Sequence, residues 1–354
     1  MNKALFITPN IFEIYIYYII SLVGITLFRI YHTRNNSITE IRVKNIISLL
    51  KYRFREKIQK IGQEKYKKII AFLICGVFLS ICIFNTYIPR KLRIHFVDVG
   101  QGDCTFIVTP RNNKILLDGG GSEFSSYSVG EKILLPYLLD RRILKIDYII
   151  FSHFDSDHCE GLLYIMKKIK VDNVVIANQY ETSENYKKFI EIANRKRTNV
   201  IIAEAGDRVT IEKNLFFNVL WPDKNNMISE NAINNNSLVC KLNYKRFSIL
   251  FTGDIEEIAE KAILSKYINK QELLKADILK VAHHGSKTSS TKEFINAVNP
   301  KYAVIGVGKD NKFGHPSEKT LENLNDKKVK VYRTDISGEI VIITDGNNVR
   351  IEGF

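Results

Sequence analysis

The feature that most constrains this sequence is a pair of long apolar runs near its N-terminal end. Residues 69–88 contain no charged residue, and residues 11–30 contain only one Glu and one Arg. About 20 helical residues span the roughly 30 Å hydrocarbon core of a bilayer. Runs that are apolar on every side argue against surface helices of a soluble protein, and no small-residue cleavage site follows the first run. We therefore expect two membrane-spanning helices.

The positive charge of the sequence is concentrated beside these runs. The formal net charge is +14, and residues 1–91 contribute +11 of it through 15 Lys and Arg against 4 Asp and Glu. Because residues 92–354 carry only +3, the overall charge is poor support for DNA binding. Residues 31–68 hold 11 basic and 3 acidic residues, and the positive-inside rule assigns such a loop to the cytoplasm. We expect residues 1–91 to be a membrane anchor that leaves the C-terminal domain outside the cell membrane.

From residue 92 the pattern changes to short strand-like runs separated by turns and helical stretches. Strands are expected at 92–99, 104–109, 114–118, 146–151, 173–177, 215–220, 237–243, 246–252, 277–282, 302–307, 338–343 and 348–352. Helices are expected at 129–140, 160–169, 183–196, 255–267, 290–298 and 316–325. This mixture predicts an α/β domain over residues 92–354, with two sheets packed face to face and helices outside them.

The motif His153-x-Asp155-x-Asp157-His158 is the strongest chemical signal. It directly follows the apolar run 146–151, so we expect it on the loop that leaves a buried strand. Four side chains on a turn can converge on one point, which a straight strand or helix would not allow. Imidazoles together with carboxylates suit Zn, Mn or Fe. A solvated acidic turn with two chance histidines is a much poorer explanation, because such a set has no folding benefit.

Three later segments also place candidate ligands after apolar runs. Thr252-Gly253-Asp254 ends one strand with a carboxylate that can bridge two cations. His283 and His284 end another, and we expect His283 to bind metal and His284 to contact the substrate or orient a ligand. His315 stands between a strand and a helix. Earlier in the chain, Asp118 follows an apolar run and is a candidate hydrogen-bond acceptor for a metal-binding histidine, or simply a turn residue.

Together these motifs resemble the ComEC family of DNA-uptake proteins. The residues that carry the resemblance are Asp98–Asp103, Leu117–Gly120, His153–His158, Thr252–Asp254, His283–Ser286 and Gly314–Pro316. The resemblance covers nearly all of residues 92–354 and corresponds to the extracytoplasmic metallo-β-lactamase domain. It implies an αββα sandwich with a metal site at one edge, and a nuclease that acts on the DNA strand that is not imported.

The ligand set departs from the usual metallo-β-lactamase motif His-x-His-x-Asp-His, because Asp155 replaces the second histidine. No histidine occurs between His158 and His283, so Asn235, Asn236 or Ser237 are candidates for the missing ligand. One or two divalent ions are expected, and the additional oxygen ligands favour Mn²⁺ or Mg²⁺, with Zn²⁺ as an alternative. The expected metal ligands are His153, Asp155, Asp157, His158, Asp254 and His283.

The expected chemistry is attack by water activated at the metal. Asp157 is expected to orient the water, and His284 or His315 to protonate the leaving oxygen or hold a phosphate. Three functions remain open: a membrane-tethered nuclease for single-stranded DNA, a hydrolase of another phosphodiester or of an envelope polymer, and a non-catalytic part of a DNA-translocation complex. Family members carry a multi-span channel ahead of this domain. Only two candidate spans occur here, which leaves a separate channel subunit as a candidate partner.

Overall fold

The computed structural model describes residues 63–87, 91–122, 127–178 and 183–353, together with residues 14, 17–18, 20–22, 25, 47–49, 51–53 and 56. The chain divides into two compact units, of which one comprises residues 7–89 and the other includes residues 90–354. The predicted boundary at residue 92 lies close to this division, and independent folding of the second unit stays a prediction.

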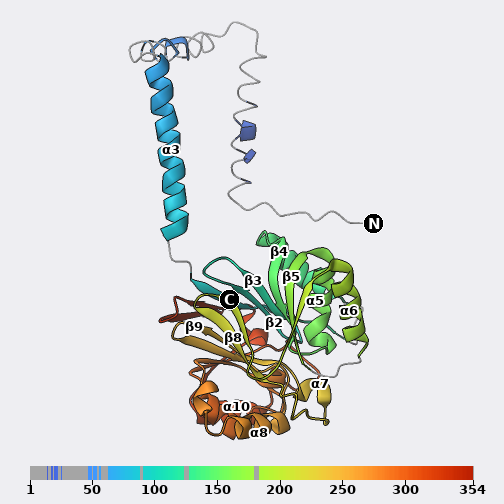
Figure 1. Ribbon diagram of the computed structural model, residues 1–354. Coiled ribbons are helices and arrows are strands. Elements are labelled where there is room, and N and C mark those ends of the chain that lie inside the picture. The colour runs from blue at the N-terminus through green and yellow to red at the C-terminus, as the bar shows by residue number, and fades with distance from the viewer. Residues whose placement is uncertain are drawn as a thin grey trace. The chain divides into compact units, whose positions relative to one another are not determined.

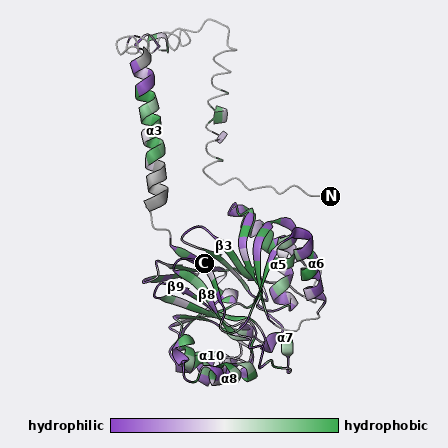
Figure 2. Cartoon of the chain, viewed as in Figure 1, coloured by the Kyte–Doolittle hydropathy of each residue, from purple (hydrophilic) through white to green (hydrophobic). Residues whose placement is uncertain are grey.

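The first unit contributes helix α3 (Gln63–Tyr87), which includes nearly all of the apolar run 69–88. In Figure 2 its middle part carries the green of hydrophobic residues. Within the described part of the chain, no helix meets the combined length and hydropathy needed to cross a membrane. Most of the first expected span, residues 11–30, lies outside the described residues.

Two sheets form the centre of the second unit (Figure 1). The order of the eight-stranded sheet is β15-β14-β1-β2-β3-β4-β5-β6. Its strands are β1 (Leu92–Phe96), β2 (Cys104–Val108), β3 (Lys114–Gly119), β4 (Lys145–Ile150), β5 (Lys170–Ala177), β6 (Asn199–Ala203), β14 (Ile340–Thr344) and β15 (Val349–Gly353). The order of the seven-stranded sheet is β13-β12-β11-β10-β9-β8-β7. Its strands are β7 (Arg208–Glu212), β8 (Leu215–Trp221), β9 (Val239–Tyr244), β10 (Phe247–Phe251), β11 (Ile278–Lys280), β12 (Tyr302–Ile305) and β13 (Lys330–Arg333).

Helices cover the outer face of each sheet, as predicted (Figure 1). The eight-stranded sheet carries η1 (Gly130–Leu134), α4 (Leu135–Asp140), α5 (Ser156–Lys168) and α6 (Glu184–Lys196). The seven-stranded sheet carries α8 (Glu257–Lys266), α9 (Lys292–Val298) and α10 (Glu318–Asp326). Shorter helical segments lie in the connections, namely α7 (Ala232–Asn235), η2 (Gln271–Leu273), η3 (Ala282–Gly285) and α11 (Thr334–Ser337). The architecture is therefore an αββα sandwich, which confirms the predicted fold of residues 92–354.

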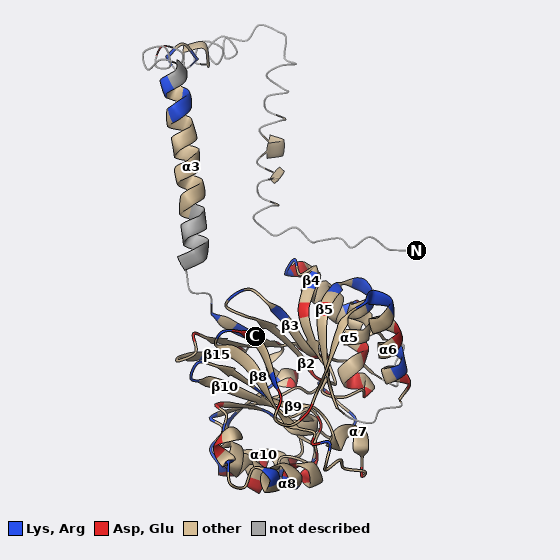
Figure 3. Cartoon of the chain, in the orientation of Figure 1, with Lys and Arg blue, Asp and Glu red and all other residues tan. Residues whose placement is uncertain are grey.

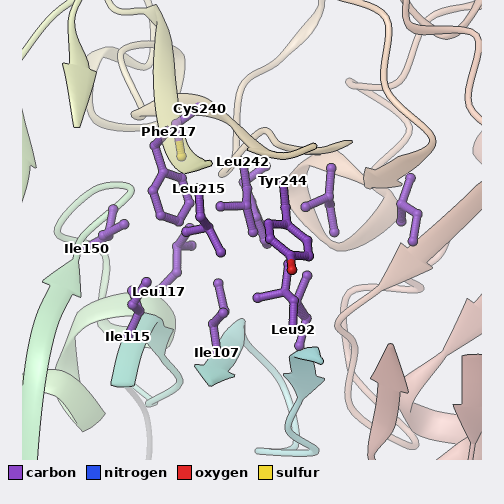
Figure 4. Packing of buried hydrophobic residues seen from close by; sticks show 14 of the residues in the cluster. Leu92, Ile107, Ile115, Leu117, Ile150, Leu215, Phe217, Cys240, Leu242 and Tyr244 are labelled. Carbon is purple, nitrogen blue, oxygen red and sulfur yellow. The ribbon is translucent and has the colours of Figure 1, made fainter. Parts of the chain in front are cut away.

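Three apolar layers hold the sandwich together. The central layer lies between the sheets, where β1 alternates buried Leu92 and Ile94 with the exposed Arg93. Figure 4 shows Leu92 and Ile107 of this sheet facing Leu242 and Tyr244 of the opposite sheet. The second layer lies under α5 and α6, and the third lies under α8, α9 and α10. Burial on both faces explains why the middle strands have nearly continuous apolar sequences.

Helix α5 packs unusually close to the end of β3. A Cβ atom on Gly161 would lie 2.0 Å from the backbone oxygen of Gly119, so no larger residue fits there without displacing the helix. The Gly161 amide also donates a hydrogen bond to the Gly120 carbonyl at 2.9 Å. The helix begins at Ser156, four residues before the predicted start, and this brings its first turn into the region of the expected metal ligands.

Candidate metal centre

The motif residues lie at the junction of β4 and α5. His153 belongs to the connecting loop, Asp155 is the N-cap of α5, and Asp157 and His158 lie in its first turn. All four were predicted on a loop; because the helix begins earlier, Asp157 and His158 lie within it instead. An N-cap aspartate usually accepts a hydrogen bond from the helix backbone, but the Asp155 side chain makes none. Its carboxylate is therefore free to serve another purpose.

Two imidazoles face each other at the centre of the site. Nε2 of His158 lies 3.3 Å from Nε2 of His284. The other ring nitrogen of each histidine is already engaged: Nδ1 of His158 lies 3.0 Å from the Asp118 carboxylate, and Nδ1 of His284 lies 2.8 Å from the Gly306 carbonyl oxygen. Such contacts fix the ring orientation of metal-binding histidines. They leave both Nε2 atoms directed at the same point. Asp118 contacts a candidate metal-binding histidine, which is one of the two roles predicted for it from the sequence.

Two carboxylates surround the facing nitrogens. Asp254 places its oxygens 3.2 Å from Nε2 of His158 and 3.4 Å from Nε2 of His284. Asp157 places an oxygen 3.2 Å from Nε2 of His284. Asp254 reaches this position because β10 ends in a turn at Gly253, whose φ of +54° and close contact with Ser237 both favour glycine. His158 and Asp157 follow strands of one sheet, whereas Asp254 and His284 follow strands of the other.

His153 completes a second group of candidate ligands. The ligand atoms of His153, His158 and Asp254 lie within 4.8 Å of one another, and so do those of Asp103, His158 and His284. Nδ1 of His153 lies 2.9 Å from the Ser152 hydroxyl. The buried atoms without a hydrogen-bond partner among the described residues include Nε2 of His153, Oδ1 of Asp254 and Oδ1 of Asp103. Because buried polar atoms are normally partnered, this mixed nitrogen and oxygen set fits one or two divalent metal ions.

The ionisation of the site follows from its concentration of opposite charges. Burial alone would lower the pKa of His158, but the carboxylates of Asp254, Asp118 and Asp157 outweigh it and hold this pKa well above its usual range. The pKa of His284 is raised in the same way, chiefly by Asp254 and Asp103. Burial would raise the pKa of Asp254, but the two imidazoles lower it well below its usual range. In the metal-free protein, protons on the imidazoles therefore balance the carboxylates.

His283 and His284 both have left-handed backbone angles, with φ of 49° and 53°, and their ring planes lie at 70° to each other. His284 is fully buried in the cluster, whereas His283 retains 23% side-chain exposure and lies 3.8 Å from Asp254 and 3.7 Å from Glu256. His283 was predicted as the metal ligand, but His284 is the histidine that lies inside the cluster. Asp155 lies farther from the centre, 3.7 Å from Nε2 of His153.

His315 lies beside this cluster without entering it. Its ring centroid is 5.8 Å from that of His283, and its buried Nδ1 has no hydrogen-bond partner among the described residues. Partial burial, followed by the nearby His284 and His283, lowers the pKa of His315 to about 4. The imidazole is therefore neutral at pH 7 and better suited to accept a hydrogen bond than to donate a proton as a cation.

The sequence comparisons agree with this site. Residues 97–224 match the metallo-beta-lactamase superfamily. ComE operon protein 3 of Bacillus subtilis (strain 168) is 33% identical over 278 residues, which cover 75% of this chain and 35% of that protein. Recombination protein 2 of Haemophilus influenzae is 31% identical over 261 residues, with coverage of 74% and 30%. Competence protein ComA of Neisseria gonorrhoeae is 28% identical over 243 residues, with coverage of 69% and 31%.

The chain belongs to the ComEC family. It spans about a third of the length of these relatives. The fold of its second unit is that of metal-dependent hydrolases of the metallo-β-lactamase type.

In this ComEC-family chain, residues 234–237 occupy the region expected to replace the missing histidine, and their side chains have different partners. The Asn235 side chain bonds to Glu230 and Glu256, and Ser237 accepts from the Asp254 amide. Asn236 is likewise used within its own loop. The neighbouring Asn234 is buried, lines the pocket above the cluster and has no partner for its Oδ1 among the described residues. Asn234, which was not a candidate from sequence, therefore presents the free oxygen.

A buried ion pair next to His284 also belongs to the site, and it was not predicted from the sequence. Nζ of Lys280 lies 2.5 Å from Asp103, whose other carboxylate oxygen is 3.5 Å from Nδ1 of His284. Both charged side chains are almost fully buried. The available signal was a lysine within the predicted strand 277–282, between apolar residues, where a core position would be expected. A lone buried carboxylate would be costly, so Lys280 allows Asp103 to stand beside the histidine.

We predict that Asp118→Asn weakens metal binding about 10- to 100-fold, the usual effect of losing such a partner. Asp118 accepts from the Ser152 amide at 2.9 Å as well as contacting His158. An asparagine amide cannot accept at both positions, so the tautomer of His158 is no longer fixed. Isothermal titration of the purified chain with Mn²⁺ measures the change. Asp147→Asn, which alters a carboxylate bonded to the Lys114 amide away from the site, should bind like wild type; equal affinity of the Asp118 variant would contradict the assignment.

We also predict that metal binding releases protons. Because nearby carboxylates raise the pKa values of His158 and His284, these imidazoles hold protons more strongly than ordinary histidines in the metal-free protein, whereas metal ligation requires the neutral form. Metal affinity should therefore fall as the pH falls. Titration with Mn²⁺ at pH 7 in buffers of different ionisation enthalpy should give an observed heat that depends on the buffer. A heat that does not depend on the buffer would show that metal binding displaces no protons from these imidazoles.

Proposed function

We propose that the second unit of this chain hydrolyses phosphodiester bonds of DNA outside the cell membrane. The observation that carries the proposal is the pair of facing Nε2 atoms of His158 and His284, enclosed by the carboxylates of Asp157 and Asp254. The ligands His153, His158, His284, Asp157 and Asp254 would hold one or two divalent ions, with Asp155 and Asn234 at the edge. The abundance of oxygen ligands favours Mn²⁺ or Mg²⁺ over Zn²⁺.

A divalent metal ion held by these residues would supply a Lewis acid for the attack of water. The protein's own groups orient the reactants. Asp157 lines the pocket and its pKa is lowered, chiefly by His158 and His284 against the effect of burial. It is therefore ionised at pH 7 and can accept the proton of the attacking water. His283 also lines the pocket, so its partly exposed ring can donate a hydrogen bond to a phosphate oxygen.

DNA as the substrate rests on the family rather than on the net charge of the domain. The competence and recombination proteins named above are its relatives. The basic residues at the C-terminal ends of α5 and α6 (Figure 3) lie at the far end of α5 from its first turn. A helix of 13 residues is about 20 Å long. Those lysines cannot touch the phosphate under attack, so substrate contacts near the site must come from the rim of the pocket.

We predict that Asp254→Ala lowers hydrolysis of single-stranded DNA and of a chromogenic phosphodiester about 100-fold or more, because misplacing a reacting group by 1 Å can cost that much. Mn²⁺ should restore chelator-treated wild type better than Zn²⁺. Asp326→Ala removes an exposed carboxylate paired with Lys292 and should retain full activity. Each variant is first checked for cooperative unfolding, since metal loss also destabilises a fold.

The enzyme proposal fails if wild type loaded with Mn²⁺, Mg²⁺ or Zn²⁺ cleaves neither substrate, or if the Asp254 variant is as fast as wild type. Hydrolysis of the small diester without cleavage of DNA would instead favour a hydrolase of another phosphodiester.

Residues 1–91 are proposed to tether this domain to the membrane, with the loop 31–68 in the cytoplasm and the C-terminus outside. The support is the charge-free sequence 69–88 and the excess of 11 basic over 3 acidic residues in the loop. We predict that a C-terminal fusion to a reporter active only outside the cytoplasm is active. Activity of a reporter that requires the cytoplasm would reverse the orientation, and recovery of the chain in the soluble fraction would reject the tether.

A further inference from the structure

The pocket above the metal ligands is too small to enclose a polymer. Its volume is about 250 Å³, which lies below the roughly 300–1,000 Å³ typical of sites that bury a drug-sized molecule. The residues that line it are Gln101, Gly121, Ser122, Asp155, Asp157, Asn234, Asp254, His283 and Phe313. Only a scissile group and its nearest neighbours can enter such a space. The rest of a substrate must lie against the rim, and Phe313 is the one large apolar side chain among these residues.

Phe313 is exposed although it is large and apolar. Its side chain is 60% exposed, so packing within the described part of the domain does not account for its position. It occupies the loop between β12 and α10, directly before Gly314 and His315. An apolar side chain left open at the mouth of a polar pocket has the character of a ligand contact rather than of a core residue.

The loop holds the ring in a defined place. The Asn311 side chain accepts hydrogen bonds from the amides of Phe313 and His315 at 3.2 and 3.0 Å, and donates to the carbonyl oxygens of Gly308 and His315 at 3.1 and 2.6 Å. The ring of Phe313 lies nearly parallel to that of His315, with 5.9 Å between centroids and 17° between planes. His315 in turn contacts His283. The aromatic face is thus connected to the metal cluster through two further rings and is pre-organised for binding.

The same loop has the charges that suit a nucleic acid. Lys309 and Lys312 are exposed on either side of the exposed Asp310. Among the described residues, neither lysine takes part in an ion pair. Single-stranded nucleic acids are bound where cationic side chains accompany the phosphates and an aromatic face accepts an unpaired base. Phe313, with a lysine next to it in the chain and a phosphodiester site beneath it, provides this combination.

We propose that Phe313 is the stacking platform for a nucleobase beside the scissile phosphate, and that it makes the site selective for unpaired strands. This inference rests on the proposed function, because it assigns DNA to the same pocket. A base that is still paired within a duplex cannot offer its face to the ring. Stacking is indifferent to sequence because every base has a flat π face, so the platform selects single strands without reading their sequence.

Binding to two labelled 12-unit oligomers tests the platform independently of cleavage. One is single-stranded oligothymidylate, and the other is the same sugar–phosphate polymer without bases. The purified full-length chain is titrated with each after chelator treatment, and fluorescence anisotropy gives the dissociation constants. Wild type should bind the thymidylate about tenfold more tightly, the effect expected for one base–aromatic stack. Phe313→Ala should remove this preference, whereas Phe313→Trp should retain it. Ile336→Ala, at another side chain that is 72% exposed, should behave like wild type.

Equal binding of the two oligomers by wild type, or no measurable binding of the thymidylate, would overturn the inference. So would a Phe313→Ala variant that keeps the full preference. These outcomes are distinct from failure of the proposed function, since a chain that binds thymidylate through Phe313 but does not hydrolyse it retains the platform and loses the nuclease.

Discussion

The close approach of α5 to the end of β3 determines the arrangement of the whole site. With no side chain on Gly161, the helix backbone comes within hydrogen-bonding distance of Gly120. This contact places the first turn of α5 so that His158 reaches Asp118 on one side and His284 on the other. If the helix were displaced by the width of a methyl group, neither contact could form at its observed length. Packing between backbones thus positions the candidate metal ligands.

The sequence predicted the order of layers well because most strands and helices are long and strongly patterned. All six predicted helices of the second unit are present, and so are its twelve predicted strands. The three missed strands, β6, β7 and β13, each form the edge of a sheet. An edge strand needs less apolar sequence, because solvent and covering helices satisfy part of its surface. Their mixed burial leaves no clear two-residue period to recognise.

The sequence predicted most residues of the candidate site, but it could not predict how their side chains are arranged. Motifs that follow apolar strands identified the histidines and aspartates of the cluster, because strand ends of one sheet share an edge. The sequence could not show which of His283 and His284 turns inward, since two consecutive left-handed residues are not a readable pattern. Asn234 and Lys280 were missed for a related reason: their roles depend on which long-range neighbour they meet.

The two sheets contribute their ligands to opposite sides of the cluster, and this has a consequence for the lifetime of the fold. Asp157 and His158 belong to the first half of the domain, whereas Asp254 and His284 come from the second half, about a hundred residues later. An ion that binds all four residues would link the two halves of the domain. It could bind them together only after both halves have folded and docked. Such an ion stabilises the native state in proportion to the logarithm of its free concentration. The metal supply of its compartment would thereby govern how long the domain persists before proteolysis, as well as how fast it works.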